Sequence, residues 1–303
     1  MSLFTRAVMA VTQLDPVEKT VTGSRAGRLL AGRFVAGDTL DDAAAAAVAL
    51  NKSGLDVSLD LLGEEVADRA GALAATDGYL ESLDRIRDEG LSANISVKLT
   101  QLGLAIDRSM AVAAVDRLAV AGLGVGTTVT IDMEDSRYTA DTVDIYAAAQ
   151  ARHGNLGVCL QAYLRRTPAD LERLIPLGGH IRLCKGAYVE EDDIAFQGSD
   201  EVDAAFARLL TVLMAAEEVR PAIATHDPRL IELTRRLGEK RSSGFEFQML
   251  YGVRSDEQHR LADKDSDVRV YLPFGSAWYP YLTRRLAERP ANAWFFVRAL
   301  VGR

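Results

Sequence analysis

The 303-residue sequence has few of the residues and segments that mark several classes of protein. Its two cysteines, Cys159 and Cys184, each lie inside an apolar run, so we expect small core side chains in a reducing compartment and no structural disulfide. No apolar run approaches the roughly 18 residues that a membrane-spanning helix needs. Arg6 interrupts the apolar N-terminus, which is not typical of a signal peptide. We therefore predict a cytoplasmic protein with at most peripheral membrane contact.

Several catalytic motifs are also missing. The four histidines show no metal-ligand spacing, so we predict no metal. Neither a G-x-S-x-G elbow nor a G-x-G-x-x-G fingerprint occurs, so any nucleotide cofactor must be bound outside a Rossmann unit. The net charge of -8, without a basic run that contains aromatic residues, argues against a nucleic-acid partner.

The chain does contain eight short β-branched runs, each followed by a helix-like stretch. This alternation predicts an α/β fold of the (β/α)8 barrel type, in which the C-terminal ends of the strands build the active site. The polar residues that end these runs are therefore candidate site residues. The runs are 57–60, 95–98, 129–132, 158–161, 181–185, 222–226, 245–248 and 268–271.

Eight such units need roughly 250 residues, which is nearly the whole chain. We predict an N-terminal helical extension over residues 1–53 and a barrel over residues 54–303. Thr39 and Asp42 have capping-box spacing before an alanine-rich helix that stops at Gly54. Thr167 and Asp227 each precede a proline, which is typical of a helix N-cap, and the second cap places His226 at a strand-to-helix junction.

Two clusters of polar residues lie at the predicted strand ends. Gly186, directly after Lys185, would let the backbone approach an anionic group closely, although on these two residues alone a simple basic loop is the favoured explanation. Lys98 and Asp132 end neighbouring strands. They can either neutralise each other in a salt bridge or face the two charges of a zwitterionic substrate.

A third cluster lies on the last predicted helix. Arg284 and Arg285 could bind a carboxylate with planar, bidentate geometry, and Glu288 lies one helical turn after Arg284, where it could hold that guanidinium. Paired arginines on helices are most often only solvated. The nearby aromatic residues Tyr279 and Tyr281 favour a partly buried position for this pair.

With these residues in view, the chain resembles the proline dehydrogenases, which use FAD to oxidise L-proline to 1-pyrroline-5-carboxylate. The similar segments follow one another in order along the chain, from the alanine-rich helix almost to the C-terminus. They are Ser96-Val97-Lys98, Ile131-Asp132, Arg182-Leu183-Cys184-Lys185-Gly186-Ala187-Tyr188, Ala224-Thr225-His226, Phe245-Glu246-Phe247-Gln248-Met249-Leu250, Val270-Tyr271-Leu272-Pro273-Phe274-Gly275 and Tyr281-Leu282-Thr283-Arg284-Arg285-Leu286-Ala287-Glu288.

The resemblance implies a distorted barrel whose last helix lies over the mouth, and it implies roles for individual residues. Substrate binding falls to Lys98, Asp132, Leu250, Tyr271, Arg284, Arg285 and Glu288. Contact with the flavin and its pyrophosphate falls to Met133, Gln161, Arg182, Lys185, Gly186, Ala187, Tyr188, Thr225 and His226. Asp132 and Arg182 take catalytic roles, near the substrate amine and the isoalloxazine respectively. Two residues depart from the pattern, because some relatives carry a valine at Cys184 and an aromatic residue at Val189.

The resemblance also implies partners. A membrane quinone would reoxidise the flavin, and the length of the chain matches the short monofunctional form, so a separate 1-pyrroline-5-carboxylate dehydrogenase would consume the product. Two other functions stay open on the residues alone. One is an aldolase-type barrel that uses Lys98 or Lys185 as a Schiff-base nucleophile. The other is a non-catalytic amino-acid-binding barrel.

Overall fold

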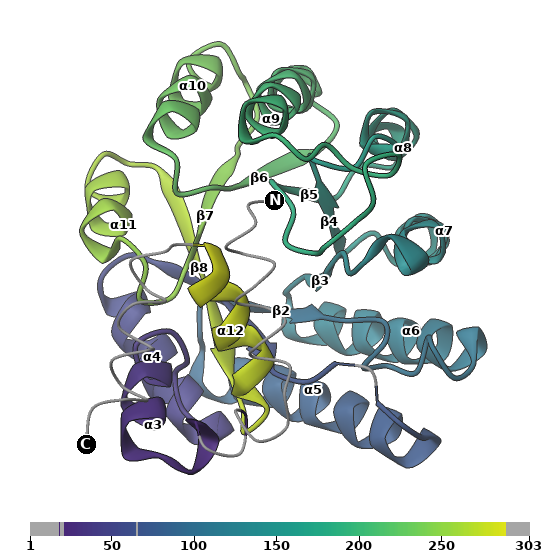
Figure 1. Ribbon diagram of the computed structural model, residues 1–303, viewed down its shortest axis with the longest axis vertical. Helices are drawn as coiled ribbons and strands as arrows, with labels where there is room; N and C mark the ends of the chain where they lie inside the picture. The colour runs from purple at the N-terminus through teal and green to yellow at the C-terminus, as the bar shows by residue number, and fades with distance from the viewer. Residues whose placement is uncertain (1–17, 19–20, 65, 289–303) are drawn as a thin grey trace.

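The computed structural model describes residues 18, 21–64 and 66–288, without the side chains of residues 26 and 286–288. Within this part of the chain, eight parallel strands form a closed barrel in sequence order, and β8 pairs with β1 (Figure 1). The predicted (β/α)8 barrel is confirmed. The strands are β1 (Asp56–Leu61), β2 (Ala93–Val97), β3 (Val129–Ile131), β4 (Leu156–Gln161), β5 (His180–Cys184), β6 (Arg220–Ala224), β7 (Glu246–Leu250) and β8 (Asp267–Phe274).

A helix follows each strand, after loops that differ in length and are longest between β5 and α9. In chain order these helices are α5 (Arg69–Glu89), α6 (Arg108–Val125), α7 (Ser136–His153), α8 (Thr167–Leu174), α9 (Ser199–Ala215), α10 (Pro228–Gly238), α11 (Ser255–Ala262) and α12 (Trp278–Glu288). Before β1 come α3 (Arg25–Ala31) and α4 (Leu40–Lys52), and the short 3-10 helix η1 (Ile175–Leu177) follows α8.

The eighth helix of the barrel is displaced, and this distorts the ring of helices. Helix α12 lies across the mouth of the barrel, where its apolar side packs against residues that precede α4 (Figure 1). Trp278 and Leu282 contact the same apolar cluster as Val21 and Phe34. Helix α4 packs against the outer side of β1 and β8 instead. A helix from before the first strand therefore covers the outer face of the β1–β8 pair, while the boundary at residues 53 and 54 stays a prediction.

Local capping explains where several helices begin. Thr39 and Asp42 form the predicted capping box of α4, and Asp227 accepts a hydrogen bond from the Arg229 amide at the start of α10. The predicted N-cap at Thr167 is wrong. Helix α8 begins at Thr167 itself after Arg166, and the Thr167 hydroxyl donates to the carbonyl oxygen of Gln161 at 2.6 Å because that buried strand end needs a donor.

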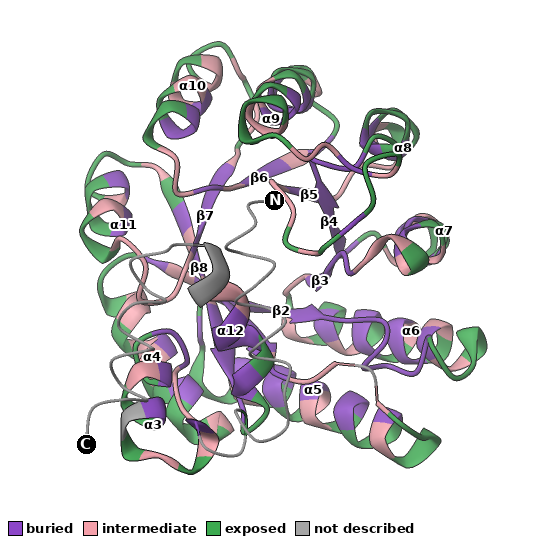
Figure 2. Cartoon of the chain, viewed as in Figure 1, coloured by how far each residue is buried: buried purple, intermediate pink, exposed green. Residues whose placement is uncertain are grey.

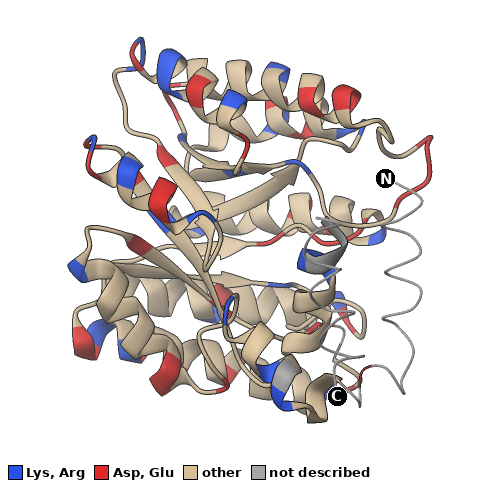
Figure 3. Cartoon of the chain, turned by 60° about the vertical axis from the view of Figure 1, so that its left-hand side comes forward, with Lys and Arg blue, Asp and Glu red and all other residues tan. Residues whose placement is uncertain are grey.

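The apolar core lies between the strands and the surrounding helices. Strand residues and the inner faces of the helices are buried, whereas the outer helix faces are exposed (Figure 2). Charged residues lie mostly on the helices and loops around the barrel (Figure 3). In β1, Val57 and Leu59 belong to this core, while the intervening Ser58 faces Ser96 of β2 with 3.2 Å between the hydroxyl oxygens. Alternate strand residues therefore point into a polar barrel interior.

Buried ion pairs and hydrogen bonds fill this interior. The Glu246 carboxylate, which is fully buried, accepts a hydrogen bond from Gln248 at 2.5 Å and one from Arg269 at 2.9 Å. Arg269 also donates to Asp56 at 3.2 Å. Because buried charges need partners, this network allows polar residues to occupy the centre of the barrel.

Candidate active site

A cavity of about 660 Å³ lies at the C-terminal ends of the strands, and α12 supplies part of its wall. It brings together every predicted site residue except Glu288, whose side chain lies outside the described residues. The predicted residues that line it are Lys98, Asp132, Met133, Gln161, Arg182, Lys185, Gly186, Ala187, Tyr188, Thr225, His226, Leu250, Tyr271, Arg284 and Arg285. Segments that are distant in the sequence therefore meet around one volume.

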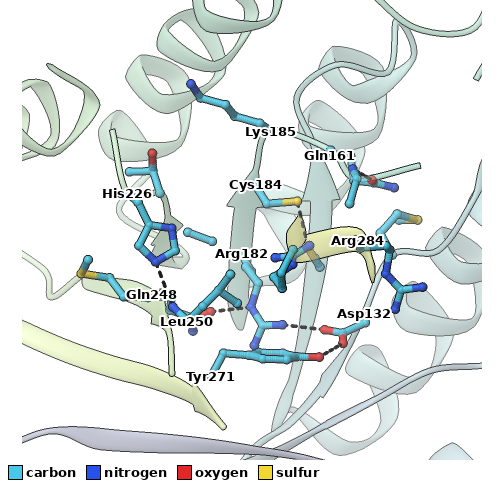
Figure 4. A pocket seen from close by; sticks show the side chains of 18 of the residues that line it. Asp132, Gln161, Arg182, Cys184, Lys185, His226, Gln248, Leu250, Tyr271 and Arg284 are labelled. Carbon is cyan, nitrogen blue, oxygen red and sulfur yellow. Dashed lines mark hydrogen bonds and ion pairs between the residues drawn. The ribbon is translucent and has the colours of Figure 1, made fainter. Parts of the chain in front are cut away.

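Asp132, directly after β3, lies at the centre of the hydrogen bonds on the cavity floor (Figure 4). One carboxylate oxygen accepts a hydrogen bond from the Arg182 guanidinium at 2.5 Å. The other accepts from the Tyr271 hydroxyl at 2.6 Å and lies 3.4 Å from the Lys98 ammonium. Both oxygens are thus held by residues from three different strand ends.

The charges of this cluster balance. Lys98 donates to Asp60 at 2.8 Å, so two cations and two carboxylates lie together with the neutral Tyr271. Burial alone would raise the pKa of Asp132, but Lys98 and Arg182 outweigh burial and hold that pKa below its usual value. Burial would lower the pKa of Lys98, yet Asp60 and the other anions raise it well above the usual range. Asp132 is therefore a carboxylate and Lys98 an ammonium at neutral pH.

Arg182, on β5, is held on three sides. Besides Asp132, it donates to the Gln248 side-chain oxygen and, at 2.9 Å, to the Ser96 hydroxyl. Its guanidinium carbon lies 5.2 Å from the centre of the Tyr271 ring. Burial opposes the charge on Arg182, but Asp132 raises the pKa of the guanidinium above its usual value. A fixed, buried positive charge therefore faces the cavity.

The two arginines of α12 have different partners. Arg284 forms a two-point ion pair with Glu64 from the loop after β1, one contact of which measures 2.9 Å. Arg285 lies over the Tyr281 ring at 5.3 Å. The predicted orientation of this pair by Glu288 stays a prediction. In the described structure the anion paired with Arg284 is Glu64, which sequence reasoning missed, and the guanidinium carbon also lies 5.9 Å from the centre of the Tyr188 ring.

The loop after β5 requires a glycine. Gly186 has a φ of +125°, and a Cβ atom there would lie 2.2 Å from the Tyr163 ring, so no other residue fits. The Lys185 ammonium pairs with Asp203 at 2.5 Å and Asp227 at 3.2 Å, and its side chain points away from Asp132 (Figure 4). Lys185 therefore supplies charge at the outer part of the cavity and not at its floor.

The remaining predicted cofactor residues form the other walls. Gln161 donates to the Glu134 carbonyl at 2.8 Å and accepts from the Ala187 amide at 3.2 Å, which ties the end of β4 to the Lys185–Ala187 loop. His226 accepts a hydrogen bond at Nε2 from the Leu250 amide at 3.0 Å, so its proton resides on Nδ1. These bonds orient the side chains before any ligand binds.

Several residues of the site had no predicted role, and three of them, Asp60, Gln248 and Glu64, hold predicted site residues in place. Asp60 and Gln248 are the last residues of two predicted strand runs, and that position alone made them candidates. Nothing in the sequence indicated that they hold Lys98 and Arg182. Glu64 lies in a loop without a pattern and could not have been found from the sequence. The described residues contain no group of three or more His, Cys, Asp or Glu side chains placed to hold a metal ion. No described helix is both long and apolar enough to cross a membrane.

Fold and site together define a (β/α)8 barrel with a cavity lined by charged side chains at the C-terminal ends of its strands. Residues 43–298 match the family described as proline dehydrogenase. The chain therefore belongs to the proline dehydrogenase family, and the prediction made from the sequence motifs is confirmed at this level.

Individual relatives agree. The chain is 37% identical over 277 residues to proline dehydrogenase 1 of Bacillus subtilis subsp. natto, with 90% of this chain and 91% of that protein covered. It is 33% identical over 307 residues to the proline dehydrogenase of Deinococcus radiodurans, with 99% and 98% covered. Proline utilization A of Bdellovibrio bacteriovorus, in a crystal structure inactivated by N-propargylglycine, has a TM-score of 0.82 and 21% identity over 99% of this chain and 37% of its own, which shows the shared fold.

Proposed function

We propose that this chain oxidises L-proline to 1-pyrroline-5-carboxylate by transferring a hydride from proline C5 to the N5 atom of FAD, with a quinone as the final acceptor. The observation that carries the proposal is that Asp132, Lys98 and the arginine pair of α12 line one cavity. A carboxylate and an ammonium group on a small cyclic substrate find opposite charges there. Family membership supplies the substrate class.

The described residues fit a flavin dinucleotide. The cavity volume of about 660 Å³ is within the range of cofactor sites. Gly186 keeps the loop after β5 open to close approach by a phosphate, and Lys185 supplies charge beside it. Arg182 provides the buried cation that would favour the anionic reduced ring. When bound, FAD would supply the hydride acceptor.

The residues of this chain would orient the substrate. Arg284, Arg285 and Lys98 would hold the proline carboxylate, and Tyr271 and Leu250 would bound the pyrrolidine ring. Binding the ring in one reactive orientation removes most of the entropic cost of bringing substrate and cofactor together. This positioning can lower the activation free energy by several kcal/mol, on the order of the contributions that orientation makes in other enzymes. Because Arg284 already forms an ion pair with Glu64, the substrate carboxylate must either share this guanidinium with Glu64 or displace Glu64 from it.

Asp132 would act on the charge of the amine. Hydride loss requires the nitrogen lone pair, so the neutral amine is the reactive form and positive charge develops on nitrogen as the hydride leaves. The carboxylate of Asp132 is ionised and fixed by three donors, so it can stabilise that charge without rearranging. Tyr271 and Arg182 would keep it in place.

The geometry disfavours the Schiff-base alternative. A nucleophilic lysine must lose its proton, whereas Asp60 and Asp132 hold the Lys98 ammonium and raise its pKa well above the usual range. Lys185 is paired with two carboxylates as well. Both lysines are therefore better suited to binding anions than to forming an imine.

The test is an anaerobic titration of the purified protein. After reconstitution with FAD, addition of L-proline should bleach the flavin absorbance. When a soluble quinone is then added, 1-pyrroline-5-carboxylate should accumulate in an amount equal to the quinone that is reduced. Failure to retain FAD would overturn the cofactor assignment. Retained FAD that L-proline does not reduce would overturn the reaction and favour the amino-acid-binding alternative.

The partners follow from the chemistry. The electrons would leave to a quinone at the membrane surface, and a separate 1-pyrroline-5-carboxylate dehydrogenase would consume the product. A flotation assay with quinone-containing vesicles tests whether the protein docks to a membrane. The assay is run with the oxidised and with the proline-reduced protein, and the two results are compared. No shift of either form to the vesicle fraction would count against peripheral docking.

A further inference from the structure

Cys159 and Cys184, the two cysteines of the chain, lie in contact inside the cavity. Their sulfur atoms are 3.6 Å apart, and both are free thiols that line the cavity wall. Figure 4 shows Cys184 among the residues around the cavity. Across the β4–β5 pair, Cys159 is in register with Arg182 and Cys184 with Gln161, so both side chains share the face that carries these two site residues. Simple core packing does not require two thiols to meet beside an open volume.

The spacing of the sulfur atoms decides which chemistry fits. A disulfide bond needs about 2.0 Å between sulfurs, so 3.6 Å keeps the pair as two separate thiols. A trivalent arsenic atom is trigonal pyramidal, so two bonds of roughly the zinc–sulfur length of about 2.3 Å, meeting at about 90 to 100°, would hold the sulfurs about 3.3 to 3.5 Å apart. The observed separation of 3.6 Å is van der Waals contact between two thiols, and one arsenic atom can bridge them after a shift of a few tenths of an ångström.

The residues around the two cysteines favour a bound atom that takes two sulfur ligands from the protein and no third ligand. Among the described residues, no third cysteine, histidine or carboxylate completes a metal site around this pair. The hydrogen bond from Cys184 and the charge of Arg182 lower the pKa of Cys159 although burial opposes them, whereas the same hydrogen bond and burial raise the pKa of Cys184 well above its usual range. Cys159 is therefore the thiol of the pair that ionises first. Cys184 is partly exposed, which opens a path for a reagent.

We propose that Cys159 and Cys184 form a dithiol site that binds one monosubstituted trivalent arsenical, and that this adduct excludes the flavin. In the reaction with an arsine oxide, two arsenic–sulfur bonds form and the arsenic–oxygen double bond breaks. Both thiol protons leave with the oxygen as one water molecule, and no electrons are transferred. The adduct would project beside Gln161 and Lys185, where the cofactor is proposed to lie, so the exclusion rests on the proposed function.

The test uses phenylarsine oxide with the full-length protein, both FAD-loaded and FAD-stripped. We expect one phenylarsenic group per stripped chain by intact mass and loss of both titratable thiols. Dithiothreitol should reverse the modification, whereas a monothiol in equal excess should not. Prior loading with FAD should slow the modification at least tenfold. Thiols absent before the reagent but restored by reductant would show a disulfide and overturn the site.

Cysteine variants separate the dithiol from reaction at one sulfur. Cys184→Val and Cys159→Ala each remove one arm, so neither variant should keep the adduct in excess monothiol, and circular dichroism should show whether each one folds. An adduct that persists in either variant would overturn the dithiol site. If the wild-type adduct forms but FAD gives no protection, the dithiol stands and the proposed position of the flavin is wrong.

Discussion

At the scale of single residues, Asp132 connects the parts of the cavity that would meet the substrate and the cofactor. It holds Arg182 through one oxygen and Tyr271 through the other, with Lys98 nearby. Removing its charge would leave two buried cations without their shared anion, and uncompensated buried charge is costly. Catalysis should therefore be more sensitive to Asp132 than to other carboxylates at the mouth.

Asp132→Ala should lower kcat/KM for L-proline by about 100-fold or more, because a preorganised charge is lost from the site of developing positive charge. Asp132→Asn keeps the hydrogen bond from Tyr271 and should lose less. Steady-state kinetics with reconstituted protein measures both variants. Wild-type turnover in Asp132→Ala would show that the carboxylate has no catalytic role.

Arg285→Met should raise the KM for L-proline about 10- to 100-fold with a smaller change in kcat, since a charge-assisted hydrogen bond to the carboxylate is worth about 1.5 to 3 kcal/mol. Arg229→Met, at an exposed guanidinium that does not line the cavity, is the matched control. Saturation curves for the two variants check the expectation. Equal KM values for Arg285→Met and wild type would remove Arg285 from the carboxylate site.

At the scale of elements, strand ends were predictable and the contents of the barrel were not. Alternation of short apolar runs with helix caps identified the strands, because those patterns are local. The polar interior depends on pairs such as Glu246 with Arg269, which only closure of the sheet brings together. The ion pair between Glu64 and Arg284 likewise joins a loop and a helix that no local pattern relates.

Helix α4 offers a test of its role as an outer barrel helix. Ala47 is fully buried in the core that α4 shares with β1, whereas Ala45 is exposed. Ala47→Leu should lower the free energy of unfolding by about 1 to 3 kcal/mol through overpacking, and Ala45→Leu should leave it nearly unchanged. Urea unfolding of both variants measures this difference. Equal stability would mean that α4 does not pack tightly on the barrel.

At the scale of the whole molecule, the free energy of unfolding should depend on pH through His180, a half-buried histidine at the start of β5. Burial lowers the pKa of His180 from 6.5 to about 4, with Arg220 and Arg269 contributing and Glu246 opposing. Between these values the unfolded chain binds a proton that the folded chain does not, so acidification favours unfolding. The contribution is fully present above pH 6.5 and declines as the pH falls toward 4.

The wild-type protein should therefore lose up to about 3 kcal/mol more stability between pH 7 and pH 4 than His180→Asn, which cannot take up that proton. Urea unfolding at several pH values checks the difference between the two curves. Parallel curves would show that His180 is protonated equally in the folded and unfolded chains.

The pairing of β8 with β1 has a consequence for biosynthesis. Asp56 and Arg269 meet across this pair although 213 residues separate them in the chain. During translation, β1 waits with one backbone edge unsatisfied until the residues of β8 have emerged from the ribosome. The last-made strand thus completes the ring, and a nascent chain stalled before residue 267 should be held by chaperones as an open, aggregation-prone sheet.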